Sequence, residues 1–268
     1  MSRFFREDAP QAAQNQADDD RLFVRAADRA MQVLGAFHHA TGPMTLSDIA
    51  KTAGIDRSAA QRLVHTLTKS GYIRRSGDDR GYLPGIRLLD HTLDLLRLDP
   101  VVQKATPVLL ELRKSLRERV DLSLYDETRL IYALRMQSKR ETFFATLVGH
   151  SVPTFCTAGG RAALSQLPED EAREILTRAA LHPFTSSTKT DPEAIMAELS
   201  LARENRFAVV CDEYALGEVA VGVAITDRNG APLSAIHLAG SLSEYTPEEF
   251  VAKAAPLAIE AANAIMAG

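Results

Sequence analysis

Residues 45–75 read TLSDIAKTAGIDRSAAQRLVHTLTKSGYIRR, and this stretch predicts two short helices joined by a tight turn. The predicted helices are Leu46–Thr52 and Arg57–Ser70, and both repeat apolar residues at i, i+3 and i+4, which is the spacing of one buried helix face. Gly54 is the turn residue, Asp56 stands where an N-cap is needed, and Gly71 ends the second helix in a left-handed conformation. The predicted buried residues are Leu46, Ile49, Ala50, Ala60, Leu63, Val64 and Leu67.

A strand, a polar turn and a second extended segment follow directly, at residues 71–75, Ser76–Arg80 and 81–83. A helix over Val24–His38 precedes the pair and completes a three-helix core. Helix-turn-helix patterns also arise by chance in helical proteins, but the added helix and the two-stranded wing favour a DNA-reading module. The N-terminal part of the chain, residues 21–85, is therefore predicted to be a winged helix-turn-helix domain that binds double-stranded DNA.

The distribution of charge along the chain also favours DNA binding by residues 21–85. Residues 21–85 hold ten Lys and Arg against five Asp and Glu, a net charge of +5. Residues 1–20 hold two basic against five acidic residues, and residues 86–268 hold 19 against 25, so the whole chain carries −4. A basic domain within an acidic chain is the charge pattern expected of a domain that contacts the phosphates of DNA.

The side chains expected to touch DNA lie on the face of the second helix opposite its apolar residues, and on the wing. Arginine reads guanine bidentately and glutamine reads adenine, whereas wing arginines are better suited to phosphates. The alternative for each is an ordinary solvated surface residue. The predicted DNA contacts are Thr45, Arg57, Ser58, Gln61, Arg62, His65, Arg74, Arg75 and Arg80.

Composition narrows the class of protein. The chain of 268 residues has only two cysteines, Cys156 and Cys211, without metal-ligand spacing, so neither a disulfide framework nor a metal site is expected. No secretory signal and no apolar run of ~18 residues is visible, and a cytoplasmic protein without a membrane partner or a cofactor is predicted. Residues 1–20 are rich in Gln, Ala and Asp and are expected to form a disordered tail.

A leucine-rich helix is predicted over residues 86–99, between the basic head and the remainder. Its leucines could pack on their own domain, but a bridging helix with this much apolar surface favours pairing with a copy of itself, giving a homodimer or a dimer of dimers. Asp99-Pro100 interrupts the helix, and a second one is predicted over Val101–Arg119.

Residues 100–268 alternate between strand and helix patterns, and Asn229-Gly230 is a hairpin signal between the last two strands. Long helices beside a largely antiparallel sheet predict an α+β ligand-binding domain. The predicted strands are Asp121–Tyr125, Leu130–Met136, Thr142–Thr146, Ala208–Cys211, Ala220–Asp227 and Pro232–Ala239. The predicted helices are Gly159–Gln166, Glu169–Ala179, Pro192–Glu204 and Pro247–Met266.

From Phe23 to its C-terminus the chain resembles IclR-type bacterial transcriptional regulators. The matching motifs are SAAQRLVHTL with KSGYI, YLPG, TAGGRAALSQL and DEYALGEVAVGVAITDRNGAPLSAIHLAG, in the order and spacing of that family. The resemblance implies a winged helix-turn-helix, a dimerising linker helix and a GAF-like C-terminal domain that binds a small effector. It also implies a regulator of a catabolic operon. The chain departs from the family pattern at Ser58-Ala59-Ala60, at Pro84, and at Arg161, which stands where the family has lysine.

The resemblance places an effector pocket on the last three strands. Where relatives that sense small keto acids have an aspartate, a cysteine and two serines, this chain has Val210, Ala220, His237 and Ala239, and Phe144 and Val152 match wall positions. Residues Ala158, Gly159 and Gly160 open a helix, whose free amides suit a carboxylate. Because most of the polar wall is lost, an aromatic or largely apolar acid is predicted over glyoxylate or pyruvate.

Two other functions remain open at this stage. A constitutive DNA-binding protein that only oligomerises would fill the pocket with side chains such as Phe144 and Phe155. An enzyme would need titratable groups in contact, and the sequence suggests only His237 in the pocket. No GxSxG or HExxH motif occurs in the sequence, and no catalytic residue is predicted.

Overall fold

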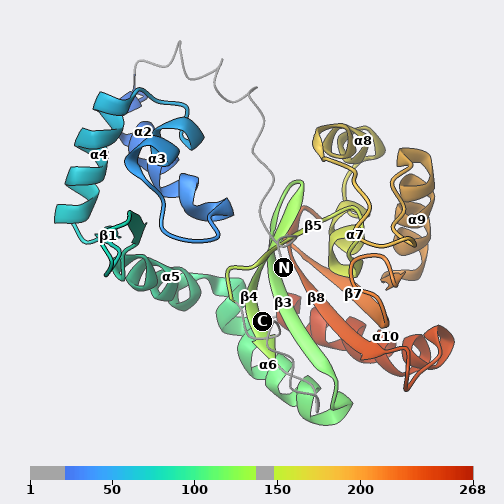
Figure 1. The fold of residues 1–268 in the computed structure, drawn as a ribbon. Helices are drawn as coiled ribbons and strands as arrows, with labels where there is room; N and C mark the ends of the chain where they lie inside the picture. The colour runs from blue at the N-terminus through green and yellow to red at the C-terminus, as the bar shows by residue number, and fades with distance from the viewer. Residues whose placement is uncertain (1–21, 137–147, 268) are drawn as a thin grey trace. The chain divides into compact units, whose positions relative to one another are not determined.

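The computed structural model describes residues 22–136 and 148–267 of the chain. The chain divides into two compact units between Leu95 and Leu96 (Figure 1). The predicted tail at residues 1–20 and the predicted strand at residues 142–146 lie outside the described residues.

Three helices build the core of the N-terminal unit: α2 (Arg25–Gly35), α3 (Leu46–Thr52) and α4 (Arg57–Lys69). The sequence predicted one helix over Val24–His38, but its last turn tightens into a 3₁₀ helix, η1 (Ala36–His39). The apolar faces meet in one cluster made of Val33, Ala36, Phe37, Ile49, Val64, Leu67 and Ile73.

The predicted helix cap and turn residues of this unit are confirmed. The Asp56 carboxylate caps α4 by accepting a hydrogen bond of 2.8 Å from the amide of Ala59. Gly54 and Gly71 have φ angles of 65° and 80°, in the left-handed region that favours glycine. The turn and the end of the reading helix are therefore encoded locally.

The wing consists of β1 (Ile73–Arg75) and β2 (Tyr82–Pro84), which pair antiparallel. Tyr82 also exchanges two backbone hydrogen bonds with Met44, of 2.8 and 3.0 Å, so the wing is tied to the loop before α3. Gly81 allows this approach, because a Cβ atom there would lie 2.6 Å from the carbonyl oxygen of Met44.

Two consecutive helices, α5 (Arg87–Leu98) and α6 (Pro100–Leu116), connect the wing to the C-terminal sheet. Asp99 separates them, and its carboxylate caps α6. The sequence predicted that the second helix continues to Arg119, but α6 ends at Leu116. Arg117 takes a left-handed conformation with φ 59°, and β3 begins two residues later. No residue of α5 is buried in this chain.

The C-terminal unit is built on a six-stranded antiparallel sheet in the order β5-β4-β3-β8-β7-β6. The unpredicted strand β5 is an edge strand of three residues that ends in Pro153, so it carries too little alternation to be detected. Gly230, with φ 86°, closes the predicted hairpin between β7 and β8. The strands are β3 (Arg119–Asp126), β4 (Arg129–Met136), β5 (Ser151–Pro153), β6 (Ala208–Cys211), β7 (Glu218–Thr226) and β8 (Pro232–Ser241).

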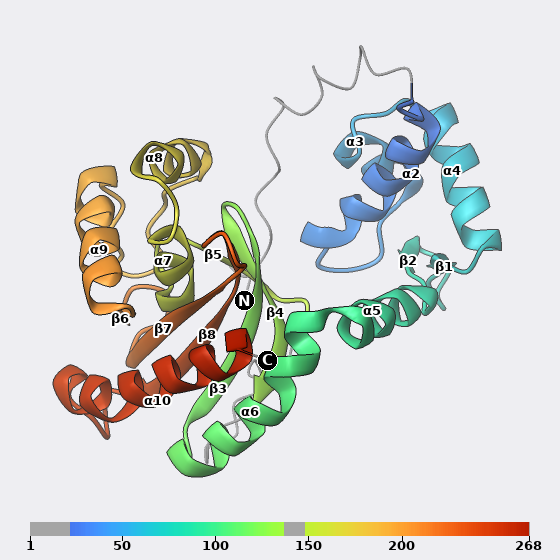
Figure 2. The same cartoon turned by 180° about the vertical axis from the view of Figure 1, so that it is seen from behind.

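Helices cover both faces of this sheet (Figures 1 and 2). On one face α6 and α10 (Pro247–Ala267) pack on Val221, Val223, Ile236 and Leu238. On the other face α7 (Ala158–Leu164) crosses β7 and β8, with α8 (Glu169–Arg178) and α9 (Pro192–Asn205) outside it. The intervening residues of β7 and β8 therefore face α7.

Helix α10 is, within the described residues, long and apolar enough to cross a membrane by length and composition alone. Its residues Phe250, Ala254, Ala258 and Ala262 are buried in the core beside the sheet. A core helix with an all-apolar inner face produces the same pattern, so this feature is weak evidence for a membrane span.

Candidate functional site

The first candidate surface is the outer face of α4. Its residues Arg57, Ser58, Gln61, Arg62 and His65 are all exposed, while the opposite face packs on the three-helix core. Side chains that are free of the core and arranged along one helix face can enter a major groove without unfolding the domain.

The wing arginines differ from one another in their partners. Arg75 donates to Asp79 at 3.1 Å and to the Tyr82 hydroxyl at 3.2 Å, and its guanidinium lies 5.0 Å from the Tyr82 ring centre. Arg80 lies 3.4 Å from Asp78. Both ion pairs are exposed, so each arginine can exchange its carboxylate for a phosphate at little cost.

Thr45 is exposed and has a local structural role. Its hydroxyl accepts from the Asp48 amide at 3.2 Å, and its own backbone amide donates to the Asp48 carboxylate at 3.0 Å, which together form the capping box of α3. The hydrogen bonds of the carboxylate with Thr45 lower the pKa of Asp48.

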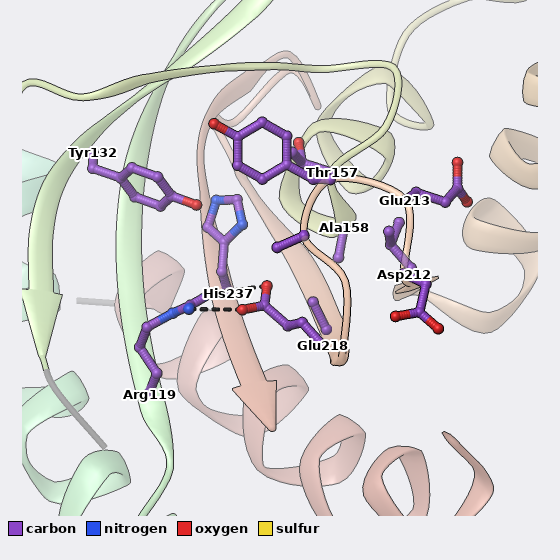
Figure 3. A pocket seen from close by; sticks show the side chains of 12 residues that line it. Arg119, Tyr132, Thr157, Ala158, Asp212, Glu213, Glu218 and His237 are labelled. Carbon is purple, nitrogen blue, oxygen red and sulfur yellow. Dashed lines mark hydrogen bonds and ion pairs between the residues drawn. The ribbon is translucent and has the colours of Figure 1, made fainter. Parts of the chain in front are cut away.

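The second candidate site is a small pocket, partly open to solvent, between the sheet and the start of α7. It is lined by residues of β3, β4, β6, β7 and β8 and by the loop before β7 (Figure 3). They are Arg119, Tyr132, Thr157, Ala158, Val210, Asp212, Glu213, Tyr214, Ala215, Glu218, Ala220 and His237.

His237 lies at the inner end of this pocket. Its Nε2 is 2.6 Å from the Ser123 hydroxyl, and its ring lies against Gly159, where a Cβ atom would be 2.2 Å from Cε1. Burial, with the charges of Arg119 and Arg135, lowers the pKa of His237 to about 3. The imidazole is therefore neutral near pH 7, with Ser123 on one nitrogen and the other available as a hydrogen-bonding group.

Tyr132 stands beside His237, with ring centres 5.3 Å apart (Figure 3). Burial raises the pKa of Tyr132, so its phenol stays protonated and is a hydrogen-bond donor. The Arg135 guanidinium lies 3.8 Å from the centre of the Tyr132 ring and stabilises the position of the ring by a cation–π contact.

A buried ion pair positions the loop over the outer side of the pocket. Arg161 donates two hydrogen bonds to the Glu213 carboxylate, at 2.7 and 2.6 Å, and a third to the Phe155 carbonyl at 2.8 Å. Lys189 adds its backbone amide to the same carboxylate at 2.9 Å. Helix α7, the segment before α9 and the loop before β7 are thus fastened together at Glu213.

Comparison with known proteins assigns the chain to a family. Residues 94–267 match the model of the bacterial transcriptional regulator IclR C-terminal domain, and residues 26–77 match the IclR helix-turn-helix domain. The chain belongs to the IclR family. Members of this family are DNA-binding transcriptional regulators, and this chain is a regulator of that type.

Individual relatives are distant but match over most of their length. The Pca regulon regulatory protein of Pseudomonas putida is 28% identical over 245 residues, which cover 91% of this chain and 84% of that protein. The transcriptional repressor IclR of Escherichia coli strain K12 is 24% identical over 244 residues, or 90% and 89% of the two chains. An IclR homolog from Microbacterium hydrocarbonoxydans, solved in complex with 4-hydroxybenzoate, has a TM-score of 0.70 at 22% identity, covering 90% and 98% of the two chains, and shows the shared fold.

The predicted pocket residues of this IclR-family regulator fall into three groups. Ala158, Val210, Ala220 and His237 line the pocket. Four further predicted residues are not among the lining residues. Gly159 lies against the His237 ring and Gly160 packs on Thr154. Ala239 joins a small cluster with Ala158, and Val152 packs on Leu130. Phe144 lies outside the described residues.

The expectation that His237 is the only titratable group at the pocket is wrong. Arg119, Glu218, Asp212 and Glu213 also line it. Arg119 and Glu218 open β3 and β7, on strands that β8 separates, so only the strand register brings them together. The one signal in the sequence is at Glu218, which begins the otherwise largely apolar strand β7.

Three observations concern the two alternative functions, a DNA-binding protein with a filled pocket and an enzyme. Phe155 is buried with Leu164 and Ile175 beneath α8 and does not enter the pocket. Within residues 22–136 and 148–267, no group of three or more His, Cys, Asp or Glu side chains is arranged to hold a metal ion. Burial raises the pKa of both Cys156 and Cys211, so neither thiol is an activated nucleophile.

Proposed function

We propose that this chain regulates a catabolic operon as a repressor whose hold on its operator is set by a small effector, an aromatic or largely apolar acid. The observation that carries the proposal is the pocket beneath α7. It combines aromatic and aliphatic walls with a few convergent polar groups, which is the usual composition of a small-molecule site.

The walls favour a flat, mostly apolar ligand. Tyr132 and Tyr214 supply aromatic faces, and Val210, Ala220 and Ala158 supply small aliphatic surface. A ring in contact with these residues gains roughly 25 cal/mol per Å² of buried apolar area, whereas a two-carbon acid leaves most of that area uncovered. The complex of the Microbacterium neighbour with 4-hydroxybenzoate supports the same ligand class.

The polar groups suit a ligand with a hydroxyl at the inner end. Neutral His237 keeps one ring nitrogen available, and the Tyr132 phenol has no hydrogen-bond partner among the described residues. A phenolic hydroxyl can donate to one of these groups and accept from the other. The amides of Ala158–Gly160 remain our proposal for a second polar contact, with Ala158 the one at the pocket wall.

Calorimetry on the full chain tests the effector class. We expect 4-hydroxybenzoate to bind more tightly than benzoate and pyruvate to give no measurable heat. His237→Phe keeps the ring against Gly159 but removes the nitrogens, so it should weaken 4-hydroxybenzoate binding about fivefold to tenfold and leave benzoate nearly unchanged. Tight pyruvate binding, or an unchanged preference for the hydroxyl in His237→Phe, would contradict the pocket interpretation.

In the DNA-reading unit, we propose that Arg57, Ser58, Gln61, Arg62 and His65 face the major groove. The wing residues Arg74, Arg75 and Arg80, together with Thr45 at the start of α3, are proposed as backbone contacts. Their exposure and the +5 charge of residues 21–85 support this division.

Two single substitutions separate base reading from phosphate contact. Gln61→Ala is expected to relax specificity at one base pair of each half-site by roughly 1–3 kcal/mol. Arg75→Ala should instead weaken binding to every sequence, with a salt slope smaller by about one unit. Fluorescence anisotropy with operator and scrambled duplexes over a salt series measures both, and equal losses on the two duplexes in Gln61→Ala would exclude base reading.

We propose a homodimer or a dimer of dimers, since Leu89, Leu93 and their neighbours on α5 are exposed in a single chain. We further propose that the protein works in the cytoplasm, where its operator is, without a cofactor or a membrane partner. The soluble bacterial regulators it matches support that location.

A further inference from the structure

Arg119 is the pocket's cationic side chain, and carboxylates of this chain already hold it. Its Nη1 and Nη2 donate to the two oxygens of Glu218 at 2.8 and 2.9 Å, and its Nε donates to Asp121 at 3.0 Å. Figure 3 shows Arg119 and Glu218 reaching toward each other from opposite sides, below the His237 ring. A two-point guanidinium–carboxylate contact of this kind is the arrangement in which arginine binds an organic acid.

Among the described residues, the charges in the ion-pair cluster around Arg119 balance without a ligand carboxylate. Arg119 and Arg135 face Asp121 and Glu218, and Arg135 lies 3.4 Å from Asp121, so two positive charges meet two negative ones. An added carboxylate would leave one buried negative charge uncompensated, which is costly in a site of low dielectric.

Glu218 is the member of this group that can leave. The Asp121 side chain is 0% exposed, whereas that of Glu218 is 25% exposed at the start of β7. A change of rotamer can therefore carry the Glu218 carboxylate toward water, and an incoming carboxylate restores the charge balance on Arg119.

We infer that Glu218 is a specificity-determining residue that holds Arg119 in place of a ligand carboxylate, so that an acid binds only by exchange with it. The inference rests on the proposed effector pocket. Replacing the Glu218 carboxylate on Arg119 by a ligand carboxylate changes the free energy of binding little. The ligand must therefore gain its affinity from a ring that packs against the aromatic and aliphatic walls. Small acids such as acetate and pyruvate lack that area and lose the competition.

The test is chemical rescue of the missing carboxylate in the full chain. Glu218→Ala should have a lower thermal midpoint than the wild type, and acetate or pyruvate should raise it, while acetamide or sodium chloride at equal concentration should not. The wild type should show no such rise. Glu218→Gln, which keeps the size of the side chain, should bind both acids at least about tenfold more tightly than the wild type by calorimetry.

A control separates this effect from the general loss of an ion pair. Glu193→Ala removes one of the two exposed carboxylates that pair with Arg173 of α8, the other being Glu169, and its thermal midpoint should not respond to carboxylates. Rescue by acetate without aromatic-acid binding to any variant would retain the exchange and reject the aromatic effector. Equal acid binding by the wild type and Glu218→Gln, or no binding by either Glu218 variant, would overturn the exchange, whatever 4-hydroxybenzoate does.

Discussion

A chain carrying both Leu89→Glu and Leu93→Glu is expected to lose operator affinity by about two to four orders of magnitude while keeping its helix content. The two leucines of α5 are 66% and 63% exposed, and Ile86, which directly precedes the helix, is 77% exposed. Burying these residues against a second copy would place two α4 helices on two half-sites. The second contact of a linked pair gains a factor of ~10²–10⁴ from effective concentration, and monomers lose it.

Light scattering gives the oligomeric state of this variant, and far-ultraviolet circular dichroism checks its helix content. Leu201→Glu is a control for placing a glutamate at an exposed leucine outside α5, since Leu201 is 52% exposed on α9. The control should keep both its mass and its operator affinity. An intact oligomer in the double variant would show that α5 does not form the interface between the two copies of the chain that bind the two half-sites.

The N-terminal unit could be predicted from sequence because its determinants are local. Asp56 and Gly71 mark the two ends of α4, and the apolar spacing between them gives its buried face. Each of these signals acts within about one helical turn, where side-chain and backbone preferences are strong. The start of β3 was mispredicted because nothing local distinguishes Arg117, which ends α6 with positive φ, from an ordinary helical residue.

The pocket was only partly predictable, because its chemistry comes from residues that meet across the sheet. Arg119 and Glu218 are 99 positions apart and meet only through the register of β3, β8 and β7. The role expected for Gly159 also depended on packing. A Cβ at Gly222 would lie 2.2 Å from the Ala158 carbonyl carbon, so this glycine lets α7 approach the sheet, and His237 then lies directly on Gly159.

The second large effect is coupling between the pocket and the operator. Saturating 4-hydroxybenzoate is expected to weaken operator binding by roughly 5- to 150-fold, the usual range for allosteric coupling of 1–3 kcal/mol. Because binding energies are linked, operator DNA should weaken the binding of 4-hydroxybenzoate by the same factor. Arg119→Gln removes the guanidinium that the carboxylate is expected to contact, so a higher concentration of 4-hydroxybenzoate should be needed to weaken operator binding.

The most direct measurement of this account is an operator titration of the full-length protein with and without 4-hydroxybenzoate, using a duplex that the protein itself selects from a random-sequence library. We expect a selected sequence with two related half-sites, and an affinity that falls by at least fivefold when the ligand is added. An affinity that stays the same at ligand concentrations shown by calorimetry to saturate the pocket would contradict this expectation.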